Sequence, residues 1–319
     1  MFNQDRKEKF INECSKTKLA RSLTFSLFNA SEEYENKYNH DICDMTKEEM
    51  SDMVSSLKGL QGKTAVQKIC ILKEYEQWCI DEKLTPNRSV SVIDGITADD
   101  VGIANIKQQM VATPQELQKQ LNIYFAPEDK NGVDNLYRAY FWLAFSGIAQ
   151  EDVLKIKNSN IDIKNMCVNF GQEFYPIYKE EVDCLRNGVI LREFNNMNPN
   201  YKDARQTRVV SEFLFRGTRG VFNTNTLRMT VSRRIKIVNE KEKGVKLSYN
   251  RIWLSGVFYR MYEREQLGFP VNFKPLVEGI VATKEYDFTN TKSTNGSVIG
   301  KKEKEFKDTY YRWKLAFHK

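Results

Sequence analysis

The segment from Val133 to about Ser146 is apolar on nearly every side of the helix that it would form. Tyr137, Tyr140 and Phe141 are followed by an apolar run that ends at Phe145. A helix that is apolar all round is buried, so the rest of its domain must fold around it. The pattern predicts a central core helix that ends near Gly147. A cofactor-stacking role for its aromatic side chains is the less favoured alternative.

The first hundred residues have the periodicity of α-helices. Helices are predicted over residues 21–38, 45–57 and 63 to about 83, with a shorter one over 97–108. Thr46 and Glu49 have the spacing of a capping box, which marks the start of the second helix. In the third helix, apolar residues recur every three or four positions from Val66 to Trp78, which indicates one buried face.

A predicted helix start near residue 112 marks a boundary between two domains. Thr113 is a good N-cap, and Pro114 suits the first position of a helix. A chain of 319 residues is long enough for two domains. We therefore predict a helical domain over residues 1–112 and a larger mixed domain over residues 113–319.

The second domain combines helices with a short pair of strands. Alternating residues from Cys167 to Phe170 and from Glu173 to Ile177 predict a hairpin that turns at Gly171. Helices are predicted over 180–196, from a cap at Thr224 or Asn225 to about 239, and from Ser248 or Asn250 to about 266. The tail is helical in character over 303–317. The predicted fold class is mainly α with a small β-hairpin or sheet.

Positive charge is concentrated in one part of the chain. Residues 201–264 contain 15 Lys and Arg against 5 Asp and Glu, a charge of +10, whereas the whole chain carries +7. A field of one sign in one region is commonly directed at a polyanion. Nucleic acid is the leading predicted partner, and a solvated surface is the alternative.

Several other classes of protein are disfavoured by composition. No apolar run approaches the roughly 20 residues of a membrane span, and the charged start resembles no export signal. The six cysteines form no C-x-x-C pair, and there are two histidines, His40 and His318. We expect reduced thiols, a cytoplasmic protein of a bacterial host that associates with the nucleoid, and no metal or cofactor.

The segment from Leu143 to Asp162 resembles the first sequence box of tyrosine recombinases and phage integrases. It runs Leu143-Ala144-Phe145-Ser146-Gly147-Ile148, continues through an acidic stretch with Leu154, and reaches Asn160-Ile161-Asp162. The order of parts along most of the chain is similar too. The resemblance implies a helical, SAM-like core-binding domain over 1–112 and an integrase catalytic-like domain over 113–319.

The groups that this family uses to cut DNA are not found at the matching positions. These positions hold Ala149 for the first arginine, Asn250 and Trp253 for the His-x-x-Arg box, and Gln172 and Glu173 in place of the hairpin lysine. Losing one preorganised donor to the transition state typically costs about a hundred- to a thousandfold in rate. We expect no catalytic residues. The alternative is an active recombinase that uses Tyr310 or Tyr311, with Arg205 or Arg251 as a catalytic arginine.

Two helices carry side chains suited to DNA. Asn225, Arg228 and Ser232 share one helix face, where Arg can bind guanine and Asn adenine in a major groove. The amino end of the helix near Lys63 can attract phosphate, although solubility alone would also explain its polar residues. In the resembled family these two helices lie against DNA from opposite sides. The predicted DNA contacts are Lys63, Thr64, Gln67, Lys68, Arg205, Arg208, Asn225, Arg228, Ser232, Arg233, Asn250 and Arg251.

The resemblance is strongest to inactive integrases that keep SPβ-type prophages dormant. It implies a sequence-specific repressor that occupies repeated double-stranded DNA operators, and a C-terminal tail that can mediate self-association. An accessory or protein-interaction module that binds DNA only loosely is a further alternative. The loop from Arg216 to Gly220 is predicted to be a plain turn, with a phosphate cradle as the alternative.

Overall fold

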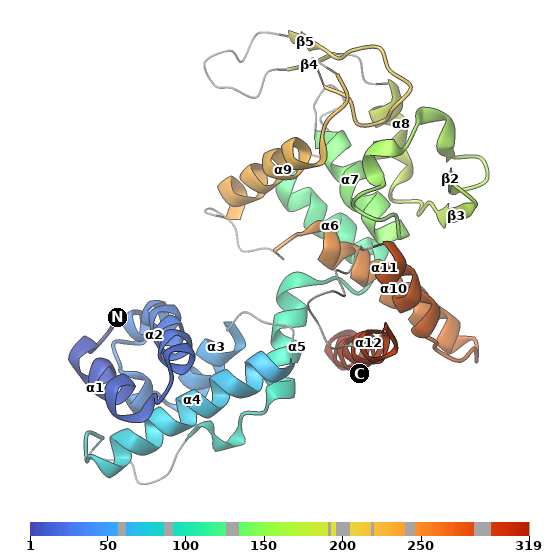
Figure 1. The fold of residues 1–319 in the computed structure, drawn as a ribbon. Helices are drawn as coiled ribbons and strands as arrows, with labels where there is room; N and C mark the ends of the chain where they lie inside the picture. Colours follow the sequence, from blue (N-terminus) through green and yellow to red (C-terminus); the bar gives the residue numbers. More distant parts are fainter. Residues whose placement is uncertain are drawn as a thin grey trace. The chain divides into compact units, whose positions relative to one another are not determined.

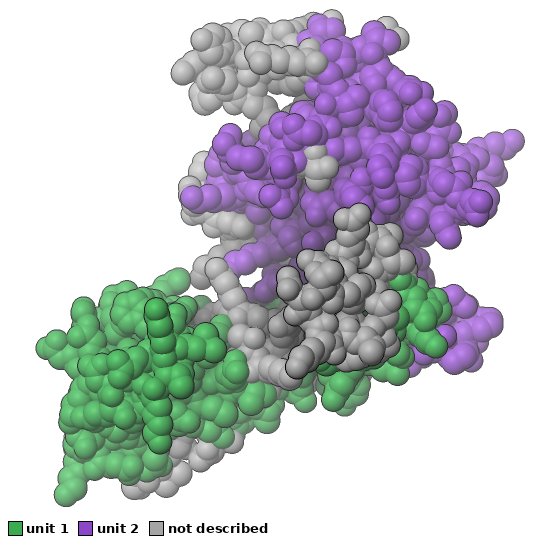
Figure 2. All heavy atoms as spheres, viewed as in Figure 1, with its two compact units in different colours: residues 1–107, 273–319 green, residues 108–272 purple. Residues whose placement is uncertain are grey.

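The computed structural model describes residues 1–56, 62–85, 92–125, 134–190, 193–195, 205–217, 220–239, 246–283 and 295–318. The chain separates into two units, one formed by residues 1–107 with 273–319 and the other by residues 108–272 (Figures 1 and 2). The C-terminal segment therefore groups with the first unit, whereas the predicted division kept it in the second domain. Within the described residues no helix is both long and apolar enough to cross a membrane.

The first unit is helical throughout its described part. Its elements are α1 (Gln4–Cys14), α2 (Lys18–Tyr38), η1 (Ile42–Asp44), α3 (Lys47–Ser56), α4 (Gly62–Asp81), η2 (Ile93–Gly95), α5 (Ala98–Gln109), α11 (Lys274–Thr283) and α12 (Asn295–Phe317). The predicted capping box is present: the Thr46 N–H donates to Glu49 Oε2 at 2.8 Å, and the Glu49 N–H donates to Thr46 Oγ1 at 3.3 Å. Helix α11 was not predicted.

Aromatic rings and one buried ion pair fill the core of the four-helix region α1–α4. Phe10 packs edge-on against Tyr75, and Phe28 does the same. Lys7 is fully buried and donates to both carboxylate oxygens of Glu35 at 2.5 Å. Glu35 also accepts from the Ser31 hydroxyl and the Ile42 N–H, so its oxygens are satisfied inside the protein.

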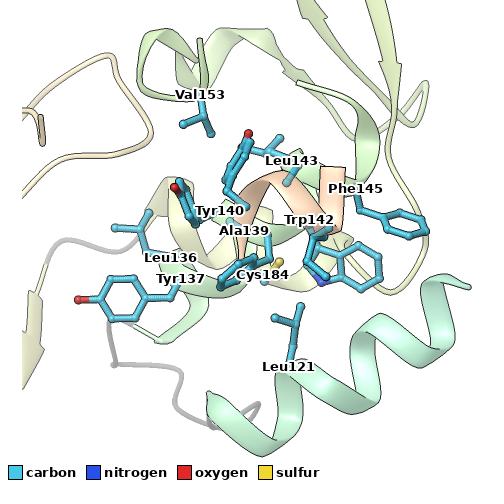
Figure 3. Close-up of a cluster of buried hydrophobic side chains, with 14 of the residues drawn as sticks. Leu121, Leu136, Tyr137, Ala139, Tyr140, Trp142, Leu143, Phe145, Val153 and Cys184 are labelled. Atoms are coloured by element: carbon cyan, nitrogen blue, oxygen red, sulfur yellow. The ribbon is translucent and has the colours of Figure 1, made fainter. Parts of the chain in front are cut away.

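The second unit is built around α7 (Asp134–Ser146), in which all thirteen residues are buried. Figure 3 shows side chains of α7 facing Leu121, Val153 and Cys184 from the surrounding elements. The prediction of a central core helix is confirmed. Its neighbours are α6 (Pro114–Tyr124), α8 (Val182–Ile190), α9 (Thr224–Asn239) and α10 (Tyr249–Gln266), with η3 (Val153–Lys155) and η4 (Asn158–Asn160).

Helix α10 approaches α7 closely at a glycine. A Cβ on Gly256 would lie 1.8 Å from the backbone oxygen of Phe145, so only glycine fits there. Gly147 ends α7 with φ of 112°, a conformation that other residues rarely adopt. Arg260 of α10 donates to the same Phe145 oxygen. These contacts fix the middle of α10 against the end of α7.

Two small antiparallel sheets complete the second unit. Strands β1 (Ile161–Asp162), β2 (Cys167–Phe170) and β3 (Glu173–Pro176) pair in that order, with Val168 opposite Ile161 and Tyr175. The hairpin turns at Gly171 as predicted, with φ of 64°. The predicted fold class, mainly helical with a small sheet, is confirmed.

The second small sheet corrects the predicted helix over 180–196. Helix α8 ends at Ile190, and β4 (Glu193–Asn195) then pairs with β5 (Arg205–Thr207). The nine residues between the strands include Asn198-Pro199-Asn200, a turn signal in the sequence that the helix prediction overlooked.

Candidate nucleic-acid interface

Helix α9 has one buried stripe that holds it in place. Leu227, Val231 and Ile235 are buried on this side. Arg234 adds an ion pair with Asp134 of α7 at 3.3 Å. Since apolar burial at three- and four-residue intervals fixes the rotation of a helix, the opposite face of α9 is presented to solvent.

The start of α9 differs by one residue from the prediction. Asn223 is the cap, because its side-chain oxygen accepts from the Thr226 N–H at 2.7 Å and its backbone oxygen accepts from Leu227. Thr224 and Asn225, the predicted caps, lie within the helix. Asn223 and Asn225 are equally good caps by residue type, so only the buried stripe distinguishes them.

The exposed face of α9 carries the predicted DNA-contacting residues. Asn225, Arg228, Ser232 and Arg233 are exposed, together with Lys236. Among the described residues, no carboxylate lies within ion-pair distance of Arg228, Arg233 or Lys236. We call this set the α9 face: Asn225, Arg228, Ser232, Arg233 and Lys236.

The beginning of α10 lies next to the α9 face. Tyr249 is buried and donates its hydroxyl proton to the Ile148 oxygen at 2.9 Å, which holds this end of the helix. Ser248 occupies the cap position, but its side chain makes no capping bond. Asn250 is exposed and Arg251 is half-buried. Burial lowers the pKa of Arg251, and its guanidinium has no carboxylate partner among the residues that the structure describes.

A pocket of about 180 Å³ lies between these two helices. Arg228 and Ser232 of α9 line it together with Asn250 of α10, so predicted contact residues from two helices meet here. Gln150 also lines the pocket and donates to the Tyr140 hydroxyl at 3.0 Å. Gln150 was not predicted, although it adjoins Ala149, the position of the family's first arginine.

Burial acts on the tyrosine that faces the pocket. It raises the pKa of Tyr140 to about 12, while the hydrogen bond from Gln150 and the charge of Arg228 act in the opposite direction. The hydroxyl is therefore neutral at physiological pH and unsuited to nucleophilic attack.

Two of the positions that match the family's catalytic groups, Ala149 and Trp253, have structural roles. The backbone oxygen of Ala149 accepts from the Asp152 and Val153 amides. The Trp253 indole donates to the Gly147 oxygen at 2.8 Å and so fastens α10 to the end of α7. Gln172 and Glu173 lie exposed at the tip of the β2–β3 hairpin.

The two candidate tyrosines lie on α12 in the first unit. Tyr310 is buried, stacks on Trp313 with ring centroids 6.1 Å apart, and packs edge-on against Phe273. Tyr311 is exposed. Their neighbour Arg312 donates to Asp99 of α5 at 2.8 Å. Tyr310 is thus a core residue of the first unit.

Arg208 does not present its charge to solvent. It is buried, and its guanidinium donates to the backbone oxygens of Arg216 and Leu214 at 2.8 Å and of Gly188 at 3.2 Å. Burial, followed by the charge of Arg216, lowers its pKa to about 10. The structure gives Arg208 the role of fastening the segment 208–217, in place of the predicted contact with DNA.

The remaining predicted contacts are described only in part. Lys63 and Thr64 lie in the first turn of α4, and Arg205 lies in β5, but their side chains are outside the described residues. Gln67 is exposed and Lys68 is half-buried. Next to Arg216, the Gly217 N–H donates to the Gly220 oxygen at 2.7 Å, and residues 218 and 219 of the predicted turn lie outside the described residues. Among the described residues no group of His, Cys, Asp or Glu could hold a metal ion.

Comparison with known proteins gives a direct match for the start of the chain. Residues 1–81 match the family model described as the MrpR N-terminal core-binding domain. These residues are similar to that core-binding domain. The match spans α1–α4, which lie within the predicted first domain.

Two other comparisons add less. The crystal structure of XerA recombinase is similar over 84% of this chain and 86% of that chain, with 12% sequence identity and a TM-score of 0.35. A TM-score this low supports no conclusion about the activity of this chain. A search of curated proteins found no match.

Proposed function

We propose that this protein binds double-stranded DNA in a sequence-specific manner and does not cut it. The observation that carries the proposal is the α9 face, where Arg228, Arg233 and Lys236 have no carboxylate partner among the described residues. Exposed cations without internal counter-charges, on a helix fixed by its buried stripe, are well placed to neutralise phosphates.

The side chains of the α9 face also suit the reading of bases. An α-helix fits the major groove of B-DNA, where Arg pairs with guanine and Asn with adenine. Arg228 and Asn225 are three positions apart and both exposed. Arg251 complements them as a phosphate contact. A half-buried guanidinium without a partner is costly in the free protein, and a phosphate would remove that cost.

The absence of cleavage is inferred from the residues at the family's catalytic positions. Alanine at 149 has no donor, and the Trp253 indole is already bonded to the Gly147 oxygen. Tyr310 is buried among aromatic rings of the first unit. A phenol with an ordinary pKa near 10 needs an activating neighbour to attack phosphate at neutral pH.

A DNA-binding protein that does not cut acts by occupying sites. Following the resemblance and the MrpR match over residues 1–81, we propose that it represses transcription from repeated operators and so maintains a dormant prophage. Association of copies through the C-terminal tail is part of this proposal. Light scattering of the full chain, with and without DNA, tests that association.

Selection of bound fragments from genomic DNA tests the central proposal. A shared motif among the recovered fragments, next to the genes that the protein silences, is the expected result. Recovery of fragments without any motif would favour the accessory module that binds DNA loosely. Incubation with a supercoiled plasmid that carries the motif tests cleavage: covalent adducts that depend on Tyr310 or Tyr311 would replace the proposal with an active recombinase.

A further inference from the structure

The pocket between α9 and α10 has two kinds of wall. Its buried lining includes the apolar side chains of Phe141, Val231, Ile235 and Leu247, together with Tyr140 and Tyr249. Its exposed lining is polar and includes Arg228, Ser232 and Asn250. The hydrocarbon therefore lies inside and the polar groups lie at the mouth, an arrangement found in sites for small ligands.

The size of the pocket matches one small ring. Its volume is about 180 Å³, and an apolar cavity of about 150 Å³ is known to hold benzene. A phosphate of the DNA backbone would contact the polar mouth but gains nothing from four apolar side chains beneath it. The inner wall thus points to an organic molecule and not to the DNA backbone alone.

The charge at the mouth selects an anion. The Arg228 guanidinium has no ion pair among the described residues, and its charge acts on Tyr140 of the same pocket, where it offsets a small part of the rise in pKa that burial causes. Ser248 and Asn250, at the amino end of the eighteen-residue helix α10, line the same pocket, and the Ser248 side chain leaves this end uncapped. Uncapped amides at a helix start favour negative groups.

We propose that this pocket binds a small organic anion, with a ring or short branched hydrocarbon against the apolar wall and a carboxylate or phosphate at Arg228. The regulatory part of this inference rests on the proposed function. Because Arg228 also belongs to the α9 face, an occupied pocket would engage the same guanidinium that DNA requires. The anion would then compete with DNA and act as an effector that releases it.

Benzoate and phenyl phosphate are suitable probes for the full-length protein. Both should give saturable shifts in protein NMR spectra at residues of the pocket, with millimolar or tighter affinity for ligands of about ten heavy atoms. Benzyl alcohol lacks the charge and inorganic phosphate lacks the ring. Each should bind about tenfold more weakly or worse, the effect of losing one charge-assisted contact or the apolar contact.

Two variants of α9 form a matched pair. Arg228→Gln should weaken benzoate binding about tenfold or more. Arg233→Gln removes an exposed cation of the same helix that does not line the pocket, and it should leave benzoate binding unchanged. Thermal unfolding of both variants checks that they fold. Equal loss in both variants, or no saturable binding of either probe to the wild type, would overturn the proposal.

Competition with DNA tests the regulatory part separately. Increasing benzoate should lower the affinity for a selected DNA fragment in the wild type and in Arg233→Gln, with sodium chloride at matched ionic strength as the control. Binding of benzoate with no effect on DNA affinity would overturn the effector role. If the protein bound no DNA at all, the proposed function would fail, and the NMR titration would still decide whether the pocket binds the anion.

The phosphate probe tests the identity of the ligand. Inorganic phosphate binding as tightly as benzoate would show a plain anion site and overturn the assignment of the ligand.

Discussion

Two lysines of the first unit, Lys7 and Lys37, differ from the cations of the α9 face in having carboxylate partners inside the protein. Lys7 is buried with Glu35, and Lys37 lies 2.7 Å from Asp52 at the surface. Arg228 and Arg233 have no such carboxylate in the described part of the chain. The comparison shows that the number of Lys and Arg residues alone does not indicate their role. A cation paired with a carboxylate of the same protein contributes to the fold. A cation without such a carboxylate is available to an external anion.

The largest expected effect comes from removing one partner of the buried ion pair between Lys7 and Glu35. Lys7→Met would leave Glu35 buried with its hydrogen bonds from Ser31 and Ile42 but without its cation. We expect the free energy of unfolding to fall by about 3–5 kcal/mol, measured by urea denaturation. Lys7→Met combined with Glu35→Leu should recover much of this loss. A double variant no more stable than the single one would show that packing, and not charge, is responsible.

The second unit contains an internal carboxyl of another kind, which is neutral. Burial raises the pKa of Glu181 to about 8, against smaller opposing effects of the Tyr178 amide and the Ser146 hydroxyl. The folded protein therefore keeps a proton that the unfolded chain, with a pKa of 4.5, releases. The free energy of unfolding should fall as pH rises between these two values and become level above about 8.

Glu181→Gln isolates this contribution. Glutamine keeps the shape and hydrogen-bonding capacity of the protonated acid but does not titrate. The difference in unfolding free energy between the variant and the wild type should grow in favour of the variant from pH 5 to pH 8, the direction fixed by linkage over roughly that range. A difference that does not change with pH would contradict the raised pKa.

Removing an externally directed charge should affect DNA and not stability. Arg228→Ala is expected to reduce discrimination between the selected site and its single-base variants by about 1–3 kcal/mol. Urea denaturation should show a free energy of unfolding close to that of the wild type, since Arg228 is exposed. Equal weakening on every DNA sequence would show that Arg228 binds phosphate, and would move the base-reading role away from this residue.

Arg251→Ala should have a smaller and sequence-independent effect. As a phosphate contact, Arg251 would contribute about 0.9 to the slope of log affinity against log salt, and that amount should be lost. Fluorescence anisotropy at a series of salt concentrations measures the slope. Lys63→Ala is expected to behave in the same way. An unchanged slope for Arg251→Ala would remove this residue from the interface.

The smallest effect is expected from an exposed internal pair. Lys37→Ala removes the contact with Asp52, and both side chains are about half exposed. Such pairs add little to stability because solvent screens them. Neither the denaturation midpoint nor DNA affinity should change measurably. A marked loss of DNA binding would show that Lys37 contacts DNA although it is paired with Asp52, and would contradict the distinction between paired and exposed cations.

Local patterns in the sequence predicted much of the fold. The all-round apolar stretch identified α7, and Thr46 with Glu49 and Thr113 with Pro114 marked the starts of α3 and α6. These signals depend on neighbours in the chain, so a single sequence contains them. The β4–β5 pair was missed although Asn198-Pro199-Asn200 between the strands is a turn signal, because each strand has only three residues and is too short to show alternation.

The candidate site shows the same limit. The i, i+3 and i+7 spacing placed Asn225, Arg228 and Ser232 on one face of a helix, as the structure has them. The burial of Arg208 depends on carbonyl groups of residues 188, 214 and 216, which tertiary folding brings together. The meeting of Gln150 with Arg228 in one pocket likewise requires the packing of α7, α9 and α10. Residue type indicates which groups can bind an anion, and only the fold decides which are exposed to do so.

The most direct test of the central claim is a competition titration of the full-length protein at physiological salt. A fragment selected from genomic DNA is labelled, and unlabelled bulk DNA is added as competitor. If the exposed cations of α9 serve a sequence-specific interface, the selected fragment should be preferred by roughly a thousandfold or more, and the fragment should remain uncut. Displacement by bulk DNA at equal concentration of sites would contradict the account.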